Sequence, residues 1–332
     1  MAHALKFVLG LVVCVFVSPP AMAEDVLQSL PPELREHADP RQPRDDDELR
    51  FWLGNLLRDH RFTLAEASAA TGLSTSDIEA AVARLGIDPA TTKAAVGGGV
   101  KLLPYPGGRH PRIGFLDGAV KPQRETKVSV FAPWDGGGYV VIDVPEAIWC
   151  QHGLLYLAHT HVPTMWTERK LELEKLEWNR ADDGRLAIER RLPNGVIFGS
   201  QAIAQPDGVR LECWLRNGSD ETLTDLRVQM CAMLKGLAGF DAQTNDNKLF
   251  RGDYACCHAV DRQRWAIMAW TPNHRTWGNP PCPCLHSDPQ FPACAPGETV
   301  RAVGRLWFYE GHAIDEKLRE LESSNWREGT SP

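Results

Sequence analysis

Several common functional signatures are missing from this sequence. The glycine runs at 97–99 and 136–138 lack the spacing and flanking residues of a phosphate loop or a dinucleotide fingerprint, and no nucleophile elbow is present. Phosphotransfer and nicotinamide chemistry therefore have no support. Positive charge is also scarce, because 36 Lys and Arg residues stand against 43 Asp and Glu, for a formal charge of −7. This balance disfavours polyanions, so nucleic acid is not expected as a partner.

Long hydrophobic runs are missing as well, apart from Phe7 to Val17 near the start of the chain. This run follows Lys6 and precedes a small-residue site that ends at Ala23, which is the order of a secretory signal. It has about half of the ~20 residues that cross a bilayer, and no later segment approaches that length. We therefore expect residues 1–23 to be a cleaved signal peptide. The mature chain is then periplasmic or extracellular, without a membrane span.

Residues 24–90 contain no cysteine and show helical periodicity, which predicts a separate helical module. Thr63 to Glu66 and Ser74 to Asp77 resemble two helix starts on either side of a turn at Gly72, as in a helix-turn-helix. The second helix is too acidic to read DNA, so the module is interpreted as a small packing or interaction module, the latter with a protein partner. Residues 91–100 are the expected linker.

Residues 101–312 change to short alternating runs separated by turns, which predicts a mainly β domain, an antiparallel β-sandwich. Alternation along Val209–Arg216 indicates a strand with one buried face. Residues 313–332 are expected to form a C-terminal helix and tail. The turn signals are Asp-Gly and Asn-Gly pairs at Asp117, Asp135, Asp183, Asn194, Asp207 and Asn217, and the meander strands between the later ones are Arg185–Arg191, Val196–Ala204, Val209–Arg216 and Leu223–Leu234.

The stretch from Leu211 to Val228 resembles the strand-turn-strand of galactose-mutarotase-type sandwiches, which implies a mutarotase-like supersandwich. A wider set of segments, including Pro104 to His110 and Gln243 to Lys248, is similar to uncharacterised exported bacterial proteins. The mutarotase family uses a histidine acid in the strand after such a turn. The corresponding strand here, 228–234, contains no histidine, so no catalytic residue is carried over.

Tryptophan is abundant, with 11 residues, and polar residues cluster at 241–251. Planar amides and carboxylates beside an aromatic platform such as Trp270 or Trp277 suit a carbohydrate, so a carbohydrate-binding or carbohydrate-modifying role is one hypothesis. A non-enzymatic interaction or scaffold protein is the alternative. His159 and His161 share one face of a strand and could bind a metal or substrate. The candidate ligand-binding residues are His159, His161, Trp166, Lys235, Asp241, Asn245, Asp246, Lys248, Arg251, His274 and Trp277.

Of the nine cysteines, five lie in a segment that also contains His258, His274 and His286. Export favours disulfides there, and long loops around 251–298 would benefit from such a staple. A metal is the alternative, since thiolates and imidazoles suit zinc or copper; no other cofactor is expected. The disulfide candidates are Cys256, Cys257, Cys282, Cys284 and Cys294, with Cys256 or Cys257 bonded to Cys282 or Cys284; the alternative metal ligands are Cys256, Cys257, Cys282, Cys284 and His286 or His258.

Overall fold

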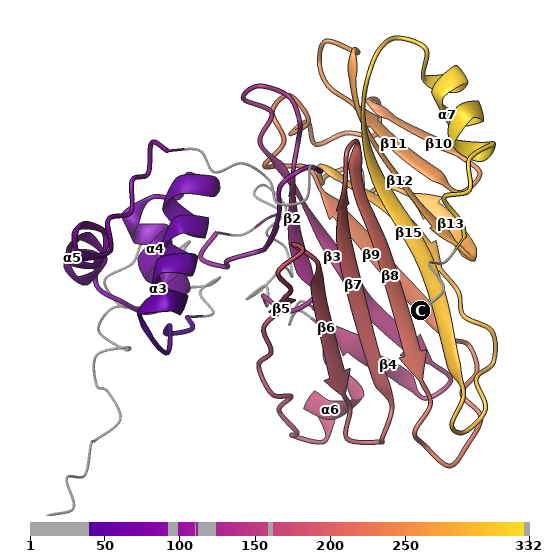
Figure 1. Ribbon diagram of the computed structural model, residues 1–332. Helices are drawn as coiled ribbons and strands as arrows, with labels where there is room; N and C mark the ends of the chain where they lie inside the picture. The colour runs from indigo at the N-terminus through magenta and orange to yellow at the C-terminus, as the bar shows by residue number, and fades with distance from the viewer. Residues whose placement is uncertain (1–39, 92–98, 110, 112–123, 159–161, 329–332) are drawn as a thin grey trace, which may run out of the picture.

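The structure, a computed structural model, describes residues 40–91, 99–109, 111, 124–158 and 162–328 (Figure 1). The chain is mainly β, with two antiparallel sheets of seven and eight strands, which we name sheet A and sheet B. This architecture confirms the predicted β-sandwich class. The predicted signal peptide and most of the predicted linker lie outside the described residues. None of the described helices is long and apolar enough to cross a membrane.

Local capping explains the helices that precede the sandwich. The Thr63 side chain accepts a hydrogen bond from the backbone N–H of Glu66, and the Glu66 carboxylate accepts one from the backbone N–H of Thr63. These two bonds form the capping box that the sequence predicts. Gly72 ends that helix in the left-handed region at φ 72°, which glycine adopts without strain. The helical elements are α3 (Asp46–Leu53), the π-helix η1 (Gly54–Asp59), α4 (Leu64–Thr71) and α5 (Thr75–Leu85).

Sheet A has the order β1-β2-β3-β9-β14-β13, with β4 paired to β3. Strands β13 and β14 occupy part of the segment 251–298 in which the sequence predicted long loops, and that prediction is corrected. Cross-strand pairing in the sheet overrides the low strand propensity of this proline-rich stretch. The strands are β1 (Leu102–Pro104), β2 (Lys127–Phe131), β3 (Tyr139–Cys150), β4 (Gly153–Leu157), β9 (Arg227–Met233), β13 (Asn273–Trp277) and β14 (Cys284–Pro289).

Sheet B has the order β10-β11-β12-β15-β8-β7-β6-β5. Its strands β6, β7 and β8 are consecutive in the chain and pair in sequence order, as the Asn-Gly and Asp-Gly turns predict. The strands are β5 (Asn179–Arg180), β6 (Leu186–Arg191), β7 (Ile197–Gln205), β8 (Gly208–Arg216), β10 (Lys248–Arg251), β11 (Tyr254–His258), β12 (Arg264–Thr271) and β15 (Thr299–Glu310).

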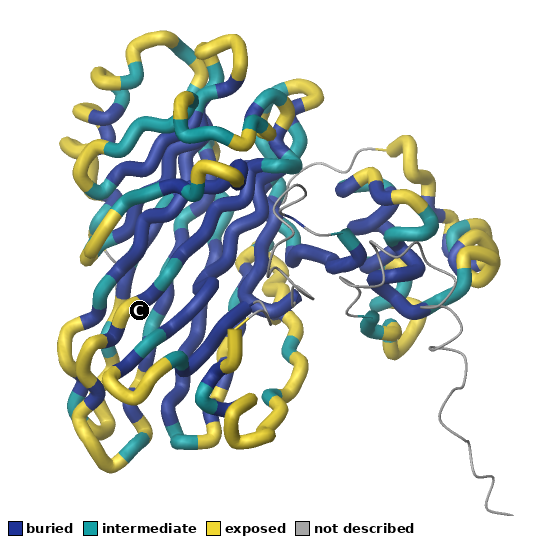
Figure 2. Tube along the Cα trace, turned by 180° about the vertical axis from the view of Figure 1, so that it is seen from behind, coloured by how far each residue is buried: buried dark blue, intermediate teal, exposed yellow. Residues whose placement is uncertain are grey.

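The main core lies between the two sheets, and Figure 2 shows the strands as the buried part of the molecule beneath exposed loops. A second apolar cluster covers the outer face of sheet B, where helix α7 (Ile314–Glu322) packs its buried Leu318 and Leu321 against Trp307. The short helix α6 (Met165–Glu168) follows β4. Both faces of sheet B are thus partly covered.

The N-terminal helices pack against the outer face of sheet A, the face turned away from the main core. Two buried polar contacts fix them there in addition to apolar packing. Asn55 Nδ2 donates to the carbonyl of Pro104 at 2.9 Å. His60 Nε2 lies 2.8 Å from Ser129 Oγ on β2. The helices and the sandwich are therefore joined by specific bonds.

Candidate metal centre

A row of polar side chains crosses the outer face of sheet A. The strand register places Lys127 opposite Asp143, and Asp143 opposite Cys231. Cys231 in turn lies opposite His286. Their chain neighbours point into the main core because side chains alternate along a strand. All four residues are buried, and buried polar groups are retained only where they find partners.

Cys231, Cys284 and His286 bring metal-ligand atoms together at one end of this row. Their ligand atoms all lie within 4.8 Å of one another. The Nε2 atom of His286 is 3.5 Å from the Sγ atom of Cys284. The Cys282 side chain also contacts the Cys284 thiol. Three thiols and one imidazole therefore form a buried cluster, which we call the Cys3His cluster.

The local sequence explains how β14 presents two of these ligands. Cys284 and His286 are alternate residues of the strand, so they share its outer face, while Leu285 between them enters the main core. Cys282 precedes the strand in a tight turn, in which the Cys284 N–H donates to the Cys282 carbonyl at 2.8 Å. Cys231 comes from the neighbouring strand β9. A turn and two paired strands therefore assemble the cluster.

The cluster favours a thiolate. Contact with the Cys231 thiol, and then with the Cys282 thiol and His286, holds the pKa of Cys284 well below its usual range despite burial. Burial alone would lower the pKa of His286, but the adjacent Cys284 thiolate and two carboxylates raise it above its ordinary value. By contrast, burial raises the pKa of Cys256 and Cys257 to about 12. Metal binding needs thiolates, and Cys284 is the thiol of this cluster whose thiolate form is stabilised.

Two carboxylates stand behind His286. Its Nδ1 atom, which has no hydrogen-bond partner among the described residues, lies 3.8 Å from Glu146 Oε2 and 3.9 Å from Asp288 Oδ1. Gln229 donates to Glu146 at 2.8 Å, and Trp277 Nε1 donates to Asp288 at 2.7 Å. A histidine that ligates a metal commonly donates its other ring N–H to a carboxylate. The two carboxylates near Nδ1 are of the type that such an arrangement uses, although both lie beyond hydrogen-bond distance.

A lysine lies beside the thiols. Lys248 Nζ donates to the carbonyl of Cys282 at 3.0 Å and to Asn245 Oδ1 at 2.8 Å. Burial lowers the pKa of Lys248, while the neighbouring thiols, Cys284 foremost, act to raise it. The Lys248 ammonium group therefore supplies positive charge next to the Cys3His cluster.

The Cys3His cluster adjoins a cavity of about 240 Å³. Glu146 and Gln229 line one part of it, and the rings of Trp149 and Trp277 another. Trp277 stacks on His286, with ring centroids 3.9 Å apart. A small molecule in this cavity would meet Cys282, Cys284 and His286, which also belong to its lining.

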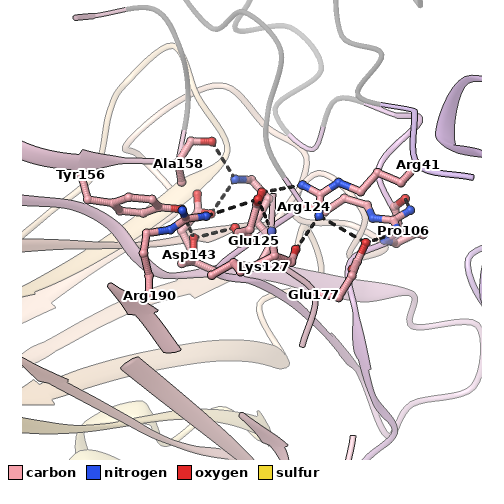
Figure 3. Close-up of polar contacts among 12 residues, drawn as sticks. Arg41, Pro106, Arg124, Glu125, Lys127, Asp143, Tyr156, Ala158, Glu177 and Arg190 are labelled. Atoms are coloured by element: carbon pink, nitrogen blue, oxygen red, sulfur yellow. Dashed lines mark hydrogen bonds and ion pairs between the residues drawn. The ribbon is translucent and has the colours of Figure 1, made fainter. Parts of the chain in front are cut away.

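At the other end of the polar row lies a network of buried charges (Figure 3). Lys127 Nζ contacts Asp143 at 2.8 Å and donates to the carbonyl of Ala158 at 3.1 Å. Arg41 Nη2 contacts Glu125 at 2.6 Å, and Arg190 reaches the same carboxylate at 3.4 Å. This network joins the segment before the helices to strands of both sheets.

Among the residues that the structure describes, the polar side chains predicted as a carbohydrate site do not gather in one cleft. Asp241 is exposed and pairs with Lys235 at 3.3 Å. Asp246, Arg251 and His274 are exposed as well. Asn245 and Lys248 instead turn toward the segment before β14. His159 and His161 lie outside the described residues.

The three tryptophans proposed as ligand-binding residues differ in burial. Trp166 is 1% exposed and donates its indole N–H to the Leu155 carbonyl at 2.6 Å, so it is a core residue. Trp270 is fully buried in the main core and cannot serve as a sugar platform. The sequence interpretation of both rings is corrected, because each ring is buried in the main core and is not available to a ligand. Trp277 is half-buried and does line a cavity.

The predicted disulfide is not formed, since no disulfide joins any of the eight described cysteines. Cys256 packs with α7 on the outer face of sheet B, and its neighbour Cys257 points into the main core. Cys282 and Cys284 belong instead to the outer face of sheet A. Cys294 is also buried and free.

The alternative metal set is therefore corrected in part. Cys282, Cys284 and His286 do come together, whereas Cys256 and Cys257 are not in the cluster. The Nδ1 atom of His258 makes a hydrogen bond with the Ala259 carbonyl at 2.8 Å. Cys231, which the sequence reasoning missed, takes their place. Its position in the alternating strand 228–234 was the available signal.

Comparison with known proteins adds little. No protein-family model and no curated protein matches the chain. Among solved structures, "Putative kojibiose phosphorylase from human microbiome" matches 57% of the chain at 10% identity and a TM-score of 0.36. A polysaccharide lyase matches 70% at 10% identity and a TM-score of 0.35. The matched regions span 27% and 35% of those chains. Both neighbours are carbohydrate-active enzymes, but likeness at this level supports no argument about the function of this chain.

Proposed function

We propose that this protein binds a soft transition metal ion, zinc or copper(I), through Cys231, Cys282, Cys284 and His286. The observation that carries the proposal is the distance of 3.5 Å between His286 Nε2 and Cys284 Sγ. Bonds of about 2.0 Å to nitrogen and 2.3 Å to sulfur at a tetrahedral angle separate the two ligand atoms by about 3.5 Å. The free side chains thus already have the separation that a shared ion requires.

Charge balance supports the same proposal. Three thiolates and one neutral imidazole give a zinc centre a net charge of −1, and buried charge is costly unless it is compensated. Lys248 offers a compensating ammonium group beside Cys282. Glu146 and Asp288 place carboxylate oxygens 3.8 Å and 3.9 Å from the Nδ1 atom of His286. Sulfur-rich donor sets select zinc and copper(I) over magnesium or calcium.

In this proposal the ion links strand β9, strand β14 and the turn before β14. The adjoining cavity gives a small ligand access to the centre. The carbohydrate role expected from the sequence has less support, because its described candidate residues do not share a cleft. The centre needs no residue from the N-terminal helices.

The test is metal content of the full chain, prepared anaerobically with reduced thiols. We expect one equivalent of zinc or copper per chain by mass spectrometry, and the element found separates the two ions. Cobalt(II) exchanged into the site should give sulfur-to-cobalt charge-transfer absorption. Loss of a ligand typically weakens binding strongly, so Cys231→Ser and Cys284→Ser should each retain less than about a tenth of the metal at a fixed chelator concentration.

Matched controls are Cys213→Ser and Cys257→Ser, which change buried cysteines of the main core. Both should keep the metal and the cobalt spectrum. Wild-type protein that binds neither ion, or a Cys231→Ser variant that keeps the full charge-transfer band, would overturn the proposal. Because the cobalt spectrum is read on wild-type protein too, a variant that fails to fold leaves the test intact.

A further inference from the structure

A second, larger cavity lies between the N-terminal helices and the sandwich. Its volume is about 730 Å³, within the usual range for ligand sites. It shares no lining residue with the cavity at the Cys3His cluster. Its walls come from the end of η1 and the two residues after it, from the segment 99–101, from Arg109, from the β2–β3 hairpin and from residues 235–236. We call it the basic cavity.

Cations dominate its lining. The cationic side chains are Arg58, Arg61, Lys101, Arg109 and Lys235, and Asp59 is the one carboxylate of the described lining. Even when the carboxylates that act on Arg109, Lys235 and Arg61 are counted, namely Glu66, Asp241 and Asp88, cations exceed carboxylates by five to four. The whole chain carries a formal charge of −7, so this excess is local and opposite in sign to the molecule.

Most of these cations are held in place. Asp59 accepts from Arg58 at 2.8 Å and from Lys101 at 2.9 Å. Arg109 makes a two-pronged contact with Glu66 and lies 4.0 Å above the ring of Phe62. The remaining exposure of the paired side chains runs from 15% for Arg58 to 29% for Lys235. The charged heads are therefore positioned in advance and still reachable from solvent.

We propose that the basic cavity binds a ligand that carries oxyanion groups, namely carboxylate, sulfate or phosphate. Guanidinium groups match the geometry of such groups with paired N–H donors. A concave wall of one charge sign focuses the field and raises the local concentration of counter-charged ligand. Arg61 follows η1 and donates to the Pro89 carbonyl, whereas Lys235 follows β9. Both line the cavity, so one ligand that bound both would contact the helical part and the sandwich.

The test is calorimetric titration of the full chain at low ionic strength with inorganic sulfate, inorganic phosphate and citrate. Glucose serves as the uncharged comparison. We expect saturable binding of at least one oxyanion, no binding of glucose, and weakening as salt is added. Comparison of the three probes shows whether the cavity prefers a sulfate, a phosphate or a carboxylate group. Arg61→Gln and Lys235→Gln should each weaken binding about tenfold, since a charge-assisted bond is lost.

Arg262→Gln is the matched control, because Arg262 shares the positive φ of 56° with Arg61 and lies outside the cavity lining. Lys317→Gln on α7 is the control for Lys235. Both controls should bind like wild-type protein. The proposal is wrong if none of the three oxyanions binds saturably, if glucose binds equally well, or if the Arg61 and Lys235 variants bind as tightly as the controls.

Discussion

His60 is a buried imidazole at the contact between the helices and sheet A. It is 2% exposed, and its ring nitrogens face the Asn55 carbonyl at 3.0 Å and Ser129 Oγ at 2.8 Å. Burial lowers the pKa of His60 to about 3; Asp59 opposes this shift, whereas Arg109 and Lys101 add to it. In the unfolded chain a histidine titrates near 6.5. The unfolded state therefore binds the proton more strongly, and acid should favour it.

We predict that the free energy of unfolding falls as pH drops below about 6.5, by up to about 1.4 kcal/mol per pH unit from this residue, until the folded pKa is reached. Urea unfolding between about pH 7.5 and 5.5 measures the slope. His60→Gln should lower stability at all these pH values but flatten the slope. The exposed His152 is the control, and His152→Gln should keep the wild-type slope. Equal slopes for wild-type protein and His60→Gln would contradict the prediction.

At the scale of elements, the pairing of β12 with β15 depends on one glycine. Gly304 lies opposite Trp270, and a Cβ atom added at Gly304 would come within 2.3 Å of the indole ring. The fully buried ring cannot move away freely because it fills the main core. We predict that Gly304→Ala destabilises the fold by about 1–3 kcal/mol in denaturant unfolding. Arg301→Ala, at an exposed position of the same strand, should stay within about 0.5 kcal/mol; comparable losses for both would refute the packing argument.

The elements were also where the sequence was most informative. The Asn-Gly and Asp-Gly turns predicted strands β6, β7 and β8 to within a residue or so of their ends, because turn chemistry is local. The predicted strand Leu223–Leu234 begins instead at Arg227. Asp225 adopts a positive φ of 51°, which breaks the run, and hydrophobic periodicity carries no information on that backbone state.

At the scale of the whole molecule, the candidate site could be predicted only in part. Cys284 and His286 share a face by simple alternation, which the sequence shows. Cys231 meets them only through the register of β9 against β14, and Lys248 only through contact between the sheet edges. Cys256 and Cys257 are adjacent residues of β11, so alternation places them on opposite faces of sheet B. That neither of them belongs to the Cys3His cluster depends on how the two sheets are placed, which the sequence does not show.

The buried network of Figure 3 couples distant parts of the chain, and Glu125 is its centre. Glu125 is 2% exposed and accepts from Arg41, from Arg190 and from the Leu176 N–H at 2.7 Å. Glu125→Gln would remove the carboxylate that faces Arg190 and Arg41, of which Arg41 keeps its 3.2 Å contact with Glu177. Breaking a buried ion pair in this way typically costs about 3–5 kcal/mol. We predict that loss in urea unfolding, with the helical circular dichroism and the tryptophan fluorescence shifting to the same lower midpoint, because Arg41 links the segment before α3 to the sandwich.

Glu221→Gln is the control, since Glu221 is 57% exposed and pairs with His152 at the surface. Its unfolding midpoint should remain close to that of wild-type protein. If Glu125→Gln cost less than about 1 kcal/mol, the network would be no stronger than a surface pair. If instead the helical signal shifted and the fluorescence did not, the helices would unfold separately from the sandwich. In that case the contacts of Arg41 and His60 would hold the two parts together without making their unfolding one cooperative transition.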